Sequence, residues 1–236
     1  MSPPKQQKWK VDPELHSCER EDGKKALDYY ETYVKEFLDA DPLRDWESIE
    51  RCKELWQFFL SLDVKLPKIC KVLDCGTKDG QFPAWLVEEG YDAVGIEISK
   101  PYVKYATDRN RPVEFGDVCD LHFKDRSFNV VFSHHLLGLV PDYQKAYEEM
   151  IRSVKAGGYI VTLDNIPGNP RKHYQLVESA EQLTEIIDSA SLNVGNGFHA
   201  VDVVFFDYYP KGFEKGREFL TILQRKRGAP RKKKKK

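Results

Sequence analysis

The feature that most constrains this fold is an apolar segment that runs straight into a glycine-bearing turn, Val72–Gly80. A second apolar segment, Val94–Ile96, follows after a stretch of helical length and ends on the carboxylate of Glu97. Parallel strands place such a turn and such a carboxylate at one edge of an α/β sheet. There, glycines admit a ligand close to the backbone and the carboxylate accepts ribose hydroxyls. The pattern therefore predicts an α/β fold that binds a nucleoside-bearing cofactor.

The spacing within the turn distinguishes between two kinds of cofactor. A dinucleotide fingerprint that starts at Gly76 needs glycines at positions 78 and 81, where this chain has Lys78 and Gln81. The turn has instead an acidic residue two positions before Gly76 and its second glycine at Gly80. The spacing therefore excludes a dinucleotide fingerprint.

Length and composition describe one α/β domain with some additions. The chain has 236 residues, of which 41% are hydrophobic and 32% are charged, and such a chain can bury a large core. No apolar run approaches the ~20 residues that cross a bilayer, and the first residues lack the apolar centre of a secretion signal. We therefore expect a cytoplasmic protein with no transmembrane segment.

The cysteines give no sign of a metal site. The five cysteines are Cys18, Cys52, Cys70, Cys75 and Cys119. They form neither a C-x-x-C pair nor a zinc-like spacing, which is typical of free thiols in a reducing compartment. We expect no bound metal.

The net charge of −1 conceals a strong asymmetry along the chain. Nine of the 37 basic residues lie between Arg225 and Lys236, so the other 224 residues carry 28 basic against 38 acidic side chains. An acidic body does not suit phosphate binding, which argues against a nucleic-acid platform. The basic tail suits RNA, an anionic membrane or a nuclear import receptor, or it is simply solvated.

The hydrophobic pattern divides the chain into four parts. They are a flexible polar arm (1–23), a helical cap (24–66), a sheet domain (67–225) and a disordered basic tail (226–236). Within the cap, helices are expected at 24–38 and 45–62, where apolar residues recur at a helical period. Together with the segment 164–178, this cap is expected to frame the pocket for a substrate above the carboxyl edge of the sheet.

From residue 71 onward, expected strands alternate with expected helices. The strands are at 71–75, 92–98, 112–115, 128–133, 158–164, 198–208 and 217–225, and the helices are at 81–89, 99–108, 142–155 and 179–190. Such alternation predicts a parallel sheet with right-handed crossovers, and the last two strands suit an antiparallel pair at one edge. The expected architecture is a seven-stranded sheet.

Further motifs follow the opening turn in a fixed order. They are Gly116-Asp117-Val118, the D-L-x-F-x-D-x-S-F pattern at 120–128, Leu137-x-x-Val140-Pro141-Asp142 and E-x-x-R-x-V-K-x-G-G at 149–158. With the turn, these motifs resemble the class I S-adenosylmethionine-dependent methyltransferases of the type 11 group over about residues 68–165. The resemblance implies a Rossmann-like sheet, S-adenosyl-L-methionine as cofactor and S-adenosyl-L-homocysteine as product.

The resemblance also implies a set of cofactor-binding residues. They are Asp74, Gly76, Thr77, Lys78, Gly80, Glu97, Ile98, Asp117, Val118, Ser133 and His134. Glu97 is expected to take the ribose hydroxyls, and Asp117 the adenine amino group. Glu114 and Asp120 are alternatives to Asp117 if the register of the third strand differs.

Two positions depart from the pattern of the family. Lys78 stands where a glycine usually lies, and its side chain either turns outward, pairs with the cofactor carboxylate or blocks the site. Leu139 stands where the group often has a histidine, so the role of that histidine cannot be assigned to this position. His134 and His135 follow the fourth strand and are the candidates for a catalytic base. Because adjacent side chains point in different directions, they make a poor metal pair.

The function expected from these residues is methyl transfer to a small-molecule acceptor. The acceptor and the oligomeric state are left open. One alternative is a non-catalytic methyltransferase-like scaffold, which Lys78 and Leu139 favour. The other is a nuclear enzyme that acts on RNA or protein, argued only from the basic tail.

Overall fold

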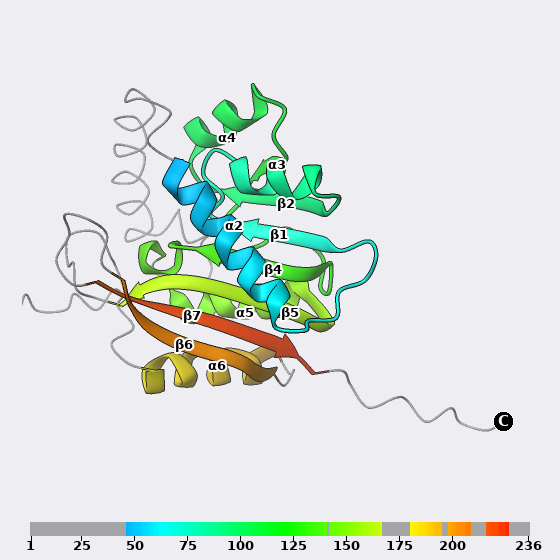
Figure 1. The fold of residues 1–236 in the computed structure, drawn as a ribbon. Helices are drawn as coiled ribbons and strands as arrows, with labels where there is room; N and C mark the ends of the chain where they lie inside the picture. Colours follow the sequence, from blue (N-terminus) through cyan, green and yellow to red (C-terminus); the bar gives the residue numbers. More distant parts are fainter. Residues whose placement is uncertain (1–45, 141, 167–179, 195–197, 209–215, 227–236) are drawn as a thin grey trace, which may run out of the picture.

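The structure is a computed structural model that describes residues 46–140, 142–166, 180–194, 198–208 and 216–226 (Figure 1). The strands are β1 (Lys71–Cys75), β2 (Asp92–Glu97), β3 (Val113–Phe115), β4 (Phe128–His134), β5 (Val154–Ile166), β6 (Phe198–Tyr208) and β7 (Gly216–Arg225). The helices are α2 (Trp46–Ser61), α3 (Gln81–Glu88), α4 (Lys100–Thr107), α5 (Tyr143–Ser153) and α6 (Ala180–Val194), with a short 3₁₀ turn η2 (Leu137–Leu139). The expected arm at 1–23, the helix at 24–38, the segment 167–178 and the tail from 227 lie outside the described residues.

The seven strands form one sheet in the order β3-β2-β1-β4-β5-β7-β6. The pairs from β3 to β5 are parallel, whereas β7 runs antiparallel to both β5 and β6. The order changes direction beside β1, and the carboxyl ends of β1 and β4 lie next to each other there. This arrangement confirms the predicted Rossmann-like sheet with an antiparallel pair at one edge, and it places a ligand-binding crevice beside the β1 turn.

Helices cover both faces of the sheet with apolar side chains. In Figure 1, α2 crosses the front of the sheet, and α5 and α6 lie behind it. Side chains along β4 alternate between the two layers, so that Phe132 packs with α2 and α3 while Val131 packs with α5 and α6. At the centre of the front layer, the fully buried ring of Trp56 on α2 lies edge-on to Phe82 and Phe132. The helix expected at 45–62 therefore belongs to the core of the sheet domain.

The expected boundary between the fourth helix and the fifth strand is wrong by several residues. The helix expected at 142–155 ends at Ser153, and β5 begins at Val154, where 158 was expected. Gly157 adopts φ +80°, and the register of β5 against β4 shifts between Phe128 and Val130. The strand was expected to begin at Gly158, the second glycine of the pair. The pair instead lies inside β5, where the pairing with β4 is irregular, and Gly157 tolerates the left-handed conformation there.

Within the described ranges, no helix combines the length and the apolar character that crossing a bilayer requires. In the same residues, no group of three or more histidine, cysteine or acidic side chains is arranged to hold a metal ion. Cys52, Cys70, Cys75 and Cys119 are free thiols, and all four are buried.

Arg225 opens the basic run of the sequence, yet its side chain lies in the core. It is 3% exposed, and its guanidinium donates hydrogen bonds to the carbonyls of Ile151 (3.0 Å) and Val154. These carbonyls belong to the last turn of α5 and the start of β5, where backbone acceptors lack helical partners. Arg225 therefore caps α5, and it does not belong to the basic tail expected at 226–236.

Replacing Arg225 with alanine is expected to lower the free energy of unfolding by about 2 kcal/mol, since hydrogen bonds from a charged donor to buried carbonyls are lost. Urea denaturation followed by circular dichroism measures the change. Lys226→Ala removes the same charge from an exposed neighbour and is the matched control. Equal stability of the two variants would contradict the capping role.

Candidate cofactor site

The turn after β1 is built from residues in the left-handed region of backbone space. Gly76, Lys78 and Gly80 have φ values of +73°, +54° and +74°. The amides of Gly76 and Thr77 both donate to the carbonyl of Ile96 at 3.0 Å, which fixes the turn to the end of β2. A Cβ atom on Gly76 would lie 2.8 Å from the Leu136 side chain, so glycine is required for this close approach.

Glu97 links the end of β2 to this turn. Its side chain is buried, and its two oxygens accept hydrogen bonds from the amides of Lys78 (2.9 Å) and Ser99 (2.8 Å). The Ile98 amide also donates to this carboxylate, so three backbone donors leave one of its roughly four acceptor positions for a further donor such as a ribose hydroxyl. The neighbouring Ile98 is half-buried. The carboxylate is therefore oriented by the backbone before any ligand arrives.

A second buried carboxylate, Asp74, lies one residue before the end of β1, and the charge of Glu97 acts on it. Burial raises the pKa of Asp74 to about 7, the nearby charge of Glu97 adds to this, and the Thr77 hydroxyl opposes it. Burial likewise raises the pKa of Glu97 to about 7 against the effect of its backbone hydrogen bonds from Ser99 and Lys78. Two carboxyl groups that ionise with difficulty favour a ligand that brings positive charge.

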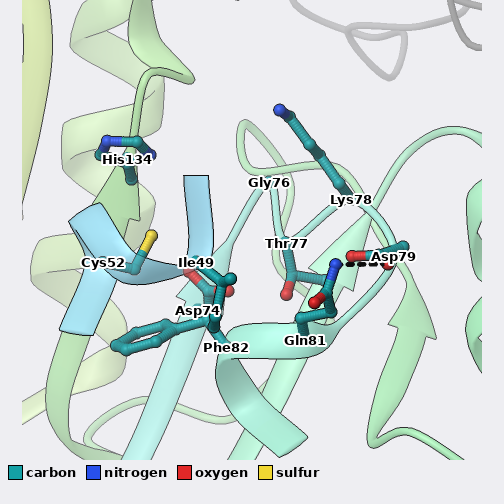
Figure 2. A pocket seen from close by; sticks show the side chains of 10 residues that line it. All are labelled: Ile49, Cys52, Asp74, Gly76, Thr77, Lys78, Asp79, Gln81, Phe82 and His134. Carbon is teal, nitrogen blue, oxygen red and sulfur yellow. Dashed lines mark hydrogen bonds between the residues drawn. The ribbon is translucent and has the colours of Figure 1, made fainter. Parts of the chain in front are cut away.

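A pocket lies between this turn, the end of β4 and the N-terminal half of α2 (Figure 2). It is lined by Ile49, Cys52, Asp74, Gly76, Thr77, Lys78, Asp79, Gln81, Phe82 and His134. Its volume is about 40 Å³, which is room for a few water molecules. The pocket therefore accommodates only a small part of a cofactor.

His134 contributes an imidazole to this pocket. Its Nε2 atom is buried and has no hydrogen-bond partner among the described residues. The ring stacks on that of His135, with centroids 4.1 Å apart and an angle of 22° between the planes. Burial holds the pKa of His134 well below its usual value, and the charges of His135, Lys78 and Arg51 lower it further. His134 is therefore neutral at physiological pH.

Lys78 keeps the backbone conformation that a glycine adopts in this position of the turn. In Figure 2 its side chain leaves the turn on the side opposite to Gln81. Its positive charge lowers the pKa of both Glu97 and His134. The lysine thus preserves the course of the chain and adds a cation to the rim of the pocket.

The residues expected to hold an adenine lie next to the end of β2. The amide of Gly116 donates to the carbonyl of Glu97 at 3.1 Å. Asp117 is 7% exposed and accepts a hydrogen bond from the Cys119 amide at 2.9 Å, and Val118 is also buried.

The two alternatives to Asp117 are both exposed. The Glu114 carboxylate pairs with the His122 ring at 2.8 Å, and Asp120 lies on the surface. Asp117 is therefore the buried carboxylate of this segment.

Six of the predicted cofactor residues do not line this pocket, namely Gly80, Glu97, Ile98, Asp117, Val118 and Ser133. Ser133 lies within the sheet. It is fully buried, and alternation along β4 directs its side chain toward α5 instead of α2. In the register of the sheet it lies between Cys75 and Thr162.

Sequence reasoning missed the arginine side chains that hold the loops of the site. Arg111 donates to the Asp79 carbonyl at 2.8 Å and pairs with its carboxylate at 2.5 Å, which clamps the β1 turn. Arg152 on α5 donates to the carbonyls of Leu121 and Phe123, each at 2.7 Å. It thereby anchors the segment after Asp117. The motif pattern contains Arg152 but gives no sign of its partners, and Arg111 belongs to no motif.

Comparison with known proteins identifies the domain that carries this geometry. Residues 73–162 match the family model described as a methyltransferase domain, of type 11. This stretch is a class I methyltransferase domain. The match to the methyltransferase domain runs from β1 to the middle of β5 and includes the turn, Glu97, Asp117 and His134.

Individual relatives agree with this assignment. Demethylmenaquinone methyltransferase from Staphylococcus aureus is 32% identical over 132 residues, which are 52% of this chain and 54% of the relative. The chain thus spans about half the length of the curated relatives it matches.

Solved structures share the fold at low identity. One is the phosphoethanolamine N-methyltransferase 2 of Haemonchus contortus in complex with S-adenosylhomocysteine, with a TM-score of 0.58 at 14% identity. The superposition covers 74% of this chain and 53% of the Haemonchus chain. The cyclase SpnF has a TM-score of 0.56 at 20% identity, with 74% and 81% covered.

The residues of the site fit S-adenosylmethionine, the methyl donor of this domain class. Glu97 has acceptor positions for a ribose, and the Oγ atom of Ser99 beside it is buried without a hydrogen-bond partner in the described part of the chain. The raised pKa values of Asp74 and Glu97 suit the positive sulfonium and ammonium groups.

Proposed function

We propose that this chain transfers the methyl group of S-adenosylmethionine to a small-molecule acceptor. The observation that carries the proposal is that the left-handed turn Gly76–Gly80 lies beside two buried carboxylates. Asp74 lines the pocket with the turn, and Glu97 accepts a hydrogen bond from the Lys78 amide of the turn. The bound cofactor supplies an electrophilic methyl group on a sulfonium centre. The protein contributes chiefly by holding donor and acceptor close and collinear.

Each residue of the site has a role in this proposal. Glu97 accepts the ribose hydroxyls, and Asp117 with the Val118 amide binds the adenine edge. Asp74 orients the turn and balances the cationic end of the cofactor. The ammonium of Lys78 pairs with the cofactor carboxylate, because it is the cation at the rim of the pocket that the methionine end would enter.

Two observations support a small-molecule acceptor. The relative from S. aureus carries the name demethylmenaquinone methyltransferase, which names a small molecule. The body of the chain is acidic apart from the tail, and such a surface disfavours nucleic acid. A cytoplasmic location, and nuclear entry through the basic tail, stay predictions.

A methyl-transfer assay tests the proposal. The chain is incubated with S-adenosylmethionine labelled in the methyl group and with a cell extract that has been separated into small molecules, RNA and protein. We expect label in the small-molecule fraction. Label in RNA or protein that disappears when residues 226–236 are removed would favour the nuclear enzyme.

The second candidate function is a non-catalytic or differently catalytic methyltransferase-like protein. Lys78 and Leu139 favour it, and so does the likeness to SpnF, which is named a cyclase and shows that this fold also serves other chemistry. Cofactor binding without label transfer to any fraction would support this candidate.

The role of Lys78 has a test of its own. Lys78→Gln is expected to weaken S-adenosylmethionine about tenfold, since a charge-assisted hydrogen bond contributes ~1.5 kcal/mol. Decarboxylated S-adenosylmethionine lacks the partner group, so its affinity is expected to stay unchanged. Calorimetric titration of both ligands measures the difference, and an equal loss for the two would contradict the pairing.

A further inference from the structure

We propose that the edge of the sheet opposite the cofactor site docks on an anionic membrane surface. Six basic side chains lie along this edge, which we call the basic edge, and the basic tail follows it directly in sequence. They are Lys65, Lys68, Lys124, Arg126, Lys155 and Lys226. This surface lies apart from the cofactor site, so its role does not depend on the proposed function.

The topology of the sheet brings these residues together. The parallel strands β1, β4 and β5 all begin at this edge, and the antiparallel β7 ends there, with Gln224 paired to Tyr159 in the first half of β5. The edge lies on the right of Figure 1, where β1 begins and β7 ends. The cofactor turn follows the other end of β1. The basic edge and the cofactor site therefore lie at opposite ends of the strands.

Hydrogen bonds join the segments that carry the cations. The Oδ1 atom of Asn129 accepts from the Lys71 amide at 2.9 Å and from the Lys155 ammonium at 3.0 Å, which links the starts of β1, β4 and β5. The Arg152 carbonyl accepts from the Arg126 amide at 3.0 Å and from the guanidinium that ends β7 at 3.4 Å. The turn before β4 and the end of β7 are thus held against each other.

The loop between α2 and β1 belongs to the same surface. The Lys65 amide of this loop donates to the Tyr159 hydroxyl at 3.4 Å, and the side-chain amide of Gln224 donates to the same oxygen at 2.9 Å. The loop therefore lies against β5 and β7, and its lysines extend the basic edge.

The positive charge of the basic edge is not compensated. None of its six cations forms an ion pair with an acidic side chain in the described part of the chain. Of the acids at this end of the sheet, Asp92 and Asp125 are held in ion pairs at 3.0 and 2.9 Å by other basic side chains, and Asp63 is exposed in the loop. Glu88 and Glu89 end α3 on the β2 side. The excess of positive charge thus runs from β1 to β7.

The tail adds charge of the same sign. Residues 227–236 contain two arginines and five lysines and no acidic residue. Because the rest of the chain is acidic overall, the basic edge and the tail form the part of the chain that attracts a polyanionic partner.

An exposed apolar side chain distinguishes between two such partners. Ile69 is 74% exposed and lies between Lys68 and Lys71 in sequence. A membrane surface accommodates this combination, because the acyl boundary takes an aliphatic group and anionic headgroups take the cations. RNA binding typically adds aromatic rings on which bases stack, but Tyr159 at this edge is buried and the tail contains no aromatic residue. The chemistry of the surface therefore favours a membrane over RNA.

Sedimentation with lipid vesicles tests the inference on the full chain. The vesicles contain phosphatidylcholine alone or with about 30 mol% phosphatidylserine. We expect the chain to sediment with the anionic vesicles and not with the neutral ones, and added sodium chloride to weaken the binding. Failure to bind anionic vesicles, or equal binding to both kinds, would overturn the inference.

A charge-matched pair of variants separates the basic edge from net charge. The edge variant combines Lys65→Gln, Lys68→Gln and Arg126→Gln, and the control on exposed positions of α4 and its end combines Lys100→Gln, Lys104→Gln and Arg109→Gln. The edge variant is expected to bind anionic vesicles about 100-fold more weakly, because each cation near such a surface contributes roughly fivefold in affinity. The control is expected to bind nearly as the unaltered chain does. Equal losses in the two variants, or no loss in the edge variant, would contradict the proposal.

The edge variant has its own check for an intact fold. Circular dichroism is expected to match that of the unaltered chain, because the three side chains are exposed. If the triple variant unfolds, Lys68→Glu in the exposed loop takes its place and is expected to weaken vesicle binding at least fivefold. Undiminished vesicle binding in folded Lys68→Glu would then contradict the proposal.

Ile69→Ser separates a membrane from RNA as the partner. The substitution leaves every charge in place and removes the apolar contact, so we expect vesicle binding to fall about fivefold. Binding to polyuridylate is the matched measurement and is expected to be equal in this variant and the unaltered chain. Unchanged vesicle binding in Ile69→Ser would contradict the apolar contact. Binding to polyuridylate that the edge variant abolishes, with no binding to vesicles, would assign the surface to RNA.

Discussion

Replacing Asp74 with asparagine is expected to stabilise the protein clearly at pH 8 and by a smaller amount at pH 5. The folded-state pKa is about 7, against an ordinary value of 3.8. Between these values the folded state binds more protons than the unfolded chain, so the free energy of unfolding falls as pH rises. Above pH 7 the cost of the buried charge is fully present, and asparagine removes it.

The size of this effect follows from the shift in pKa. Each unit corresponds to about 1.4 kcal/mol, and interaction with Glu97 divides the cost between two groups, so we expect a gain of about 1–3 kcal/mol at pH 8. Urea denaturation at the two pH values measures it. Asp92→Asn, at an exposed carboxylate paired with Lys71, is the control and is expected to change little at either pH. A loss of stability in Asp74→Asn at pH 8 would contradict the account.

Glu97→Ala is expected to weaken S-adenosylmethionine by about 1–3 kcal/mol, or roughly 5- to 150-fold in dissociation constant. The substitution removes the ribose acceptor and frees the amides of Lys78 and Ser99, which orient the turn. Calorimetric titration at pH 8 measures the change, because Glu97 is largely ionised there.

Two further variants sharpen this test. Glu114→Gln alters a nearby exposed carboxylate and is expected to leave cofactor affinity unchanged, whereas Asp117→Asn is expected to weaken it. If Glu114→Gln weakens binding and Asp117→Asn does not, the assignment of the adenine contact is wrong. Unchanged affinity in Glu97→Ala would mean that the cofactor does not bind at the end of β2.

The sheet and its cofactor edge were predictable because their signals are local. Predominantly apolar runs such as Val72–Cys75 and Phe128–Ser133 are typical of strands buried on both faces. The glycines at 76 and 80 occupy left-handed positions, as their place in the turn predicts. The β5 boundary failed because a glycine pair is as compatible with an irregular point inside a strand as with the beginning of one.

The walls of the pocket were not predictable, because they depend on tertiary packing. The period of α2 marks Ile49 and Cys52 as apolar-face residues without saying what they face. The clamp of Arg111 on Asp79 joins residues 32 positions apart, and no local pattern specifies it. Arg225 looks like part of a basic tail in sequence and is a buried helix cap in the fold.

Calorimetric titration of the full chain with S-adenosylmethionine at pH 8 tests the central claim most directly. The account predicts a single saturable site for which S-adenosylhomocysteine competes and which Glu97→Ala weakens. At about 1 mM cofactor, even a site with a binding free energy of only about −4 kcal/mol gives a detectable signal. Absence of binding at this concentration would therefore contradict the account.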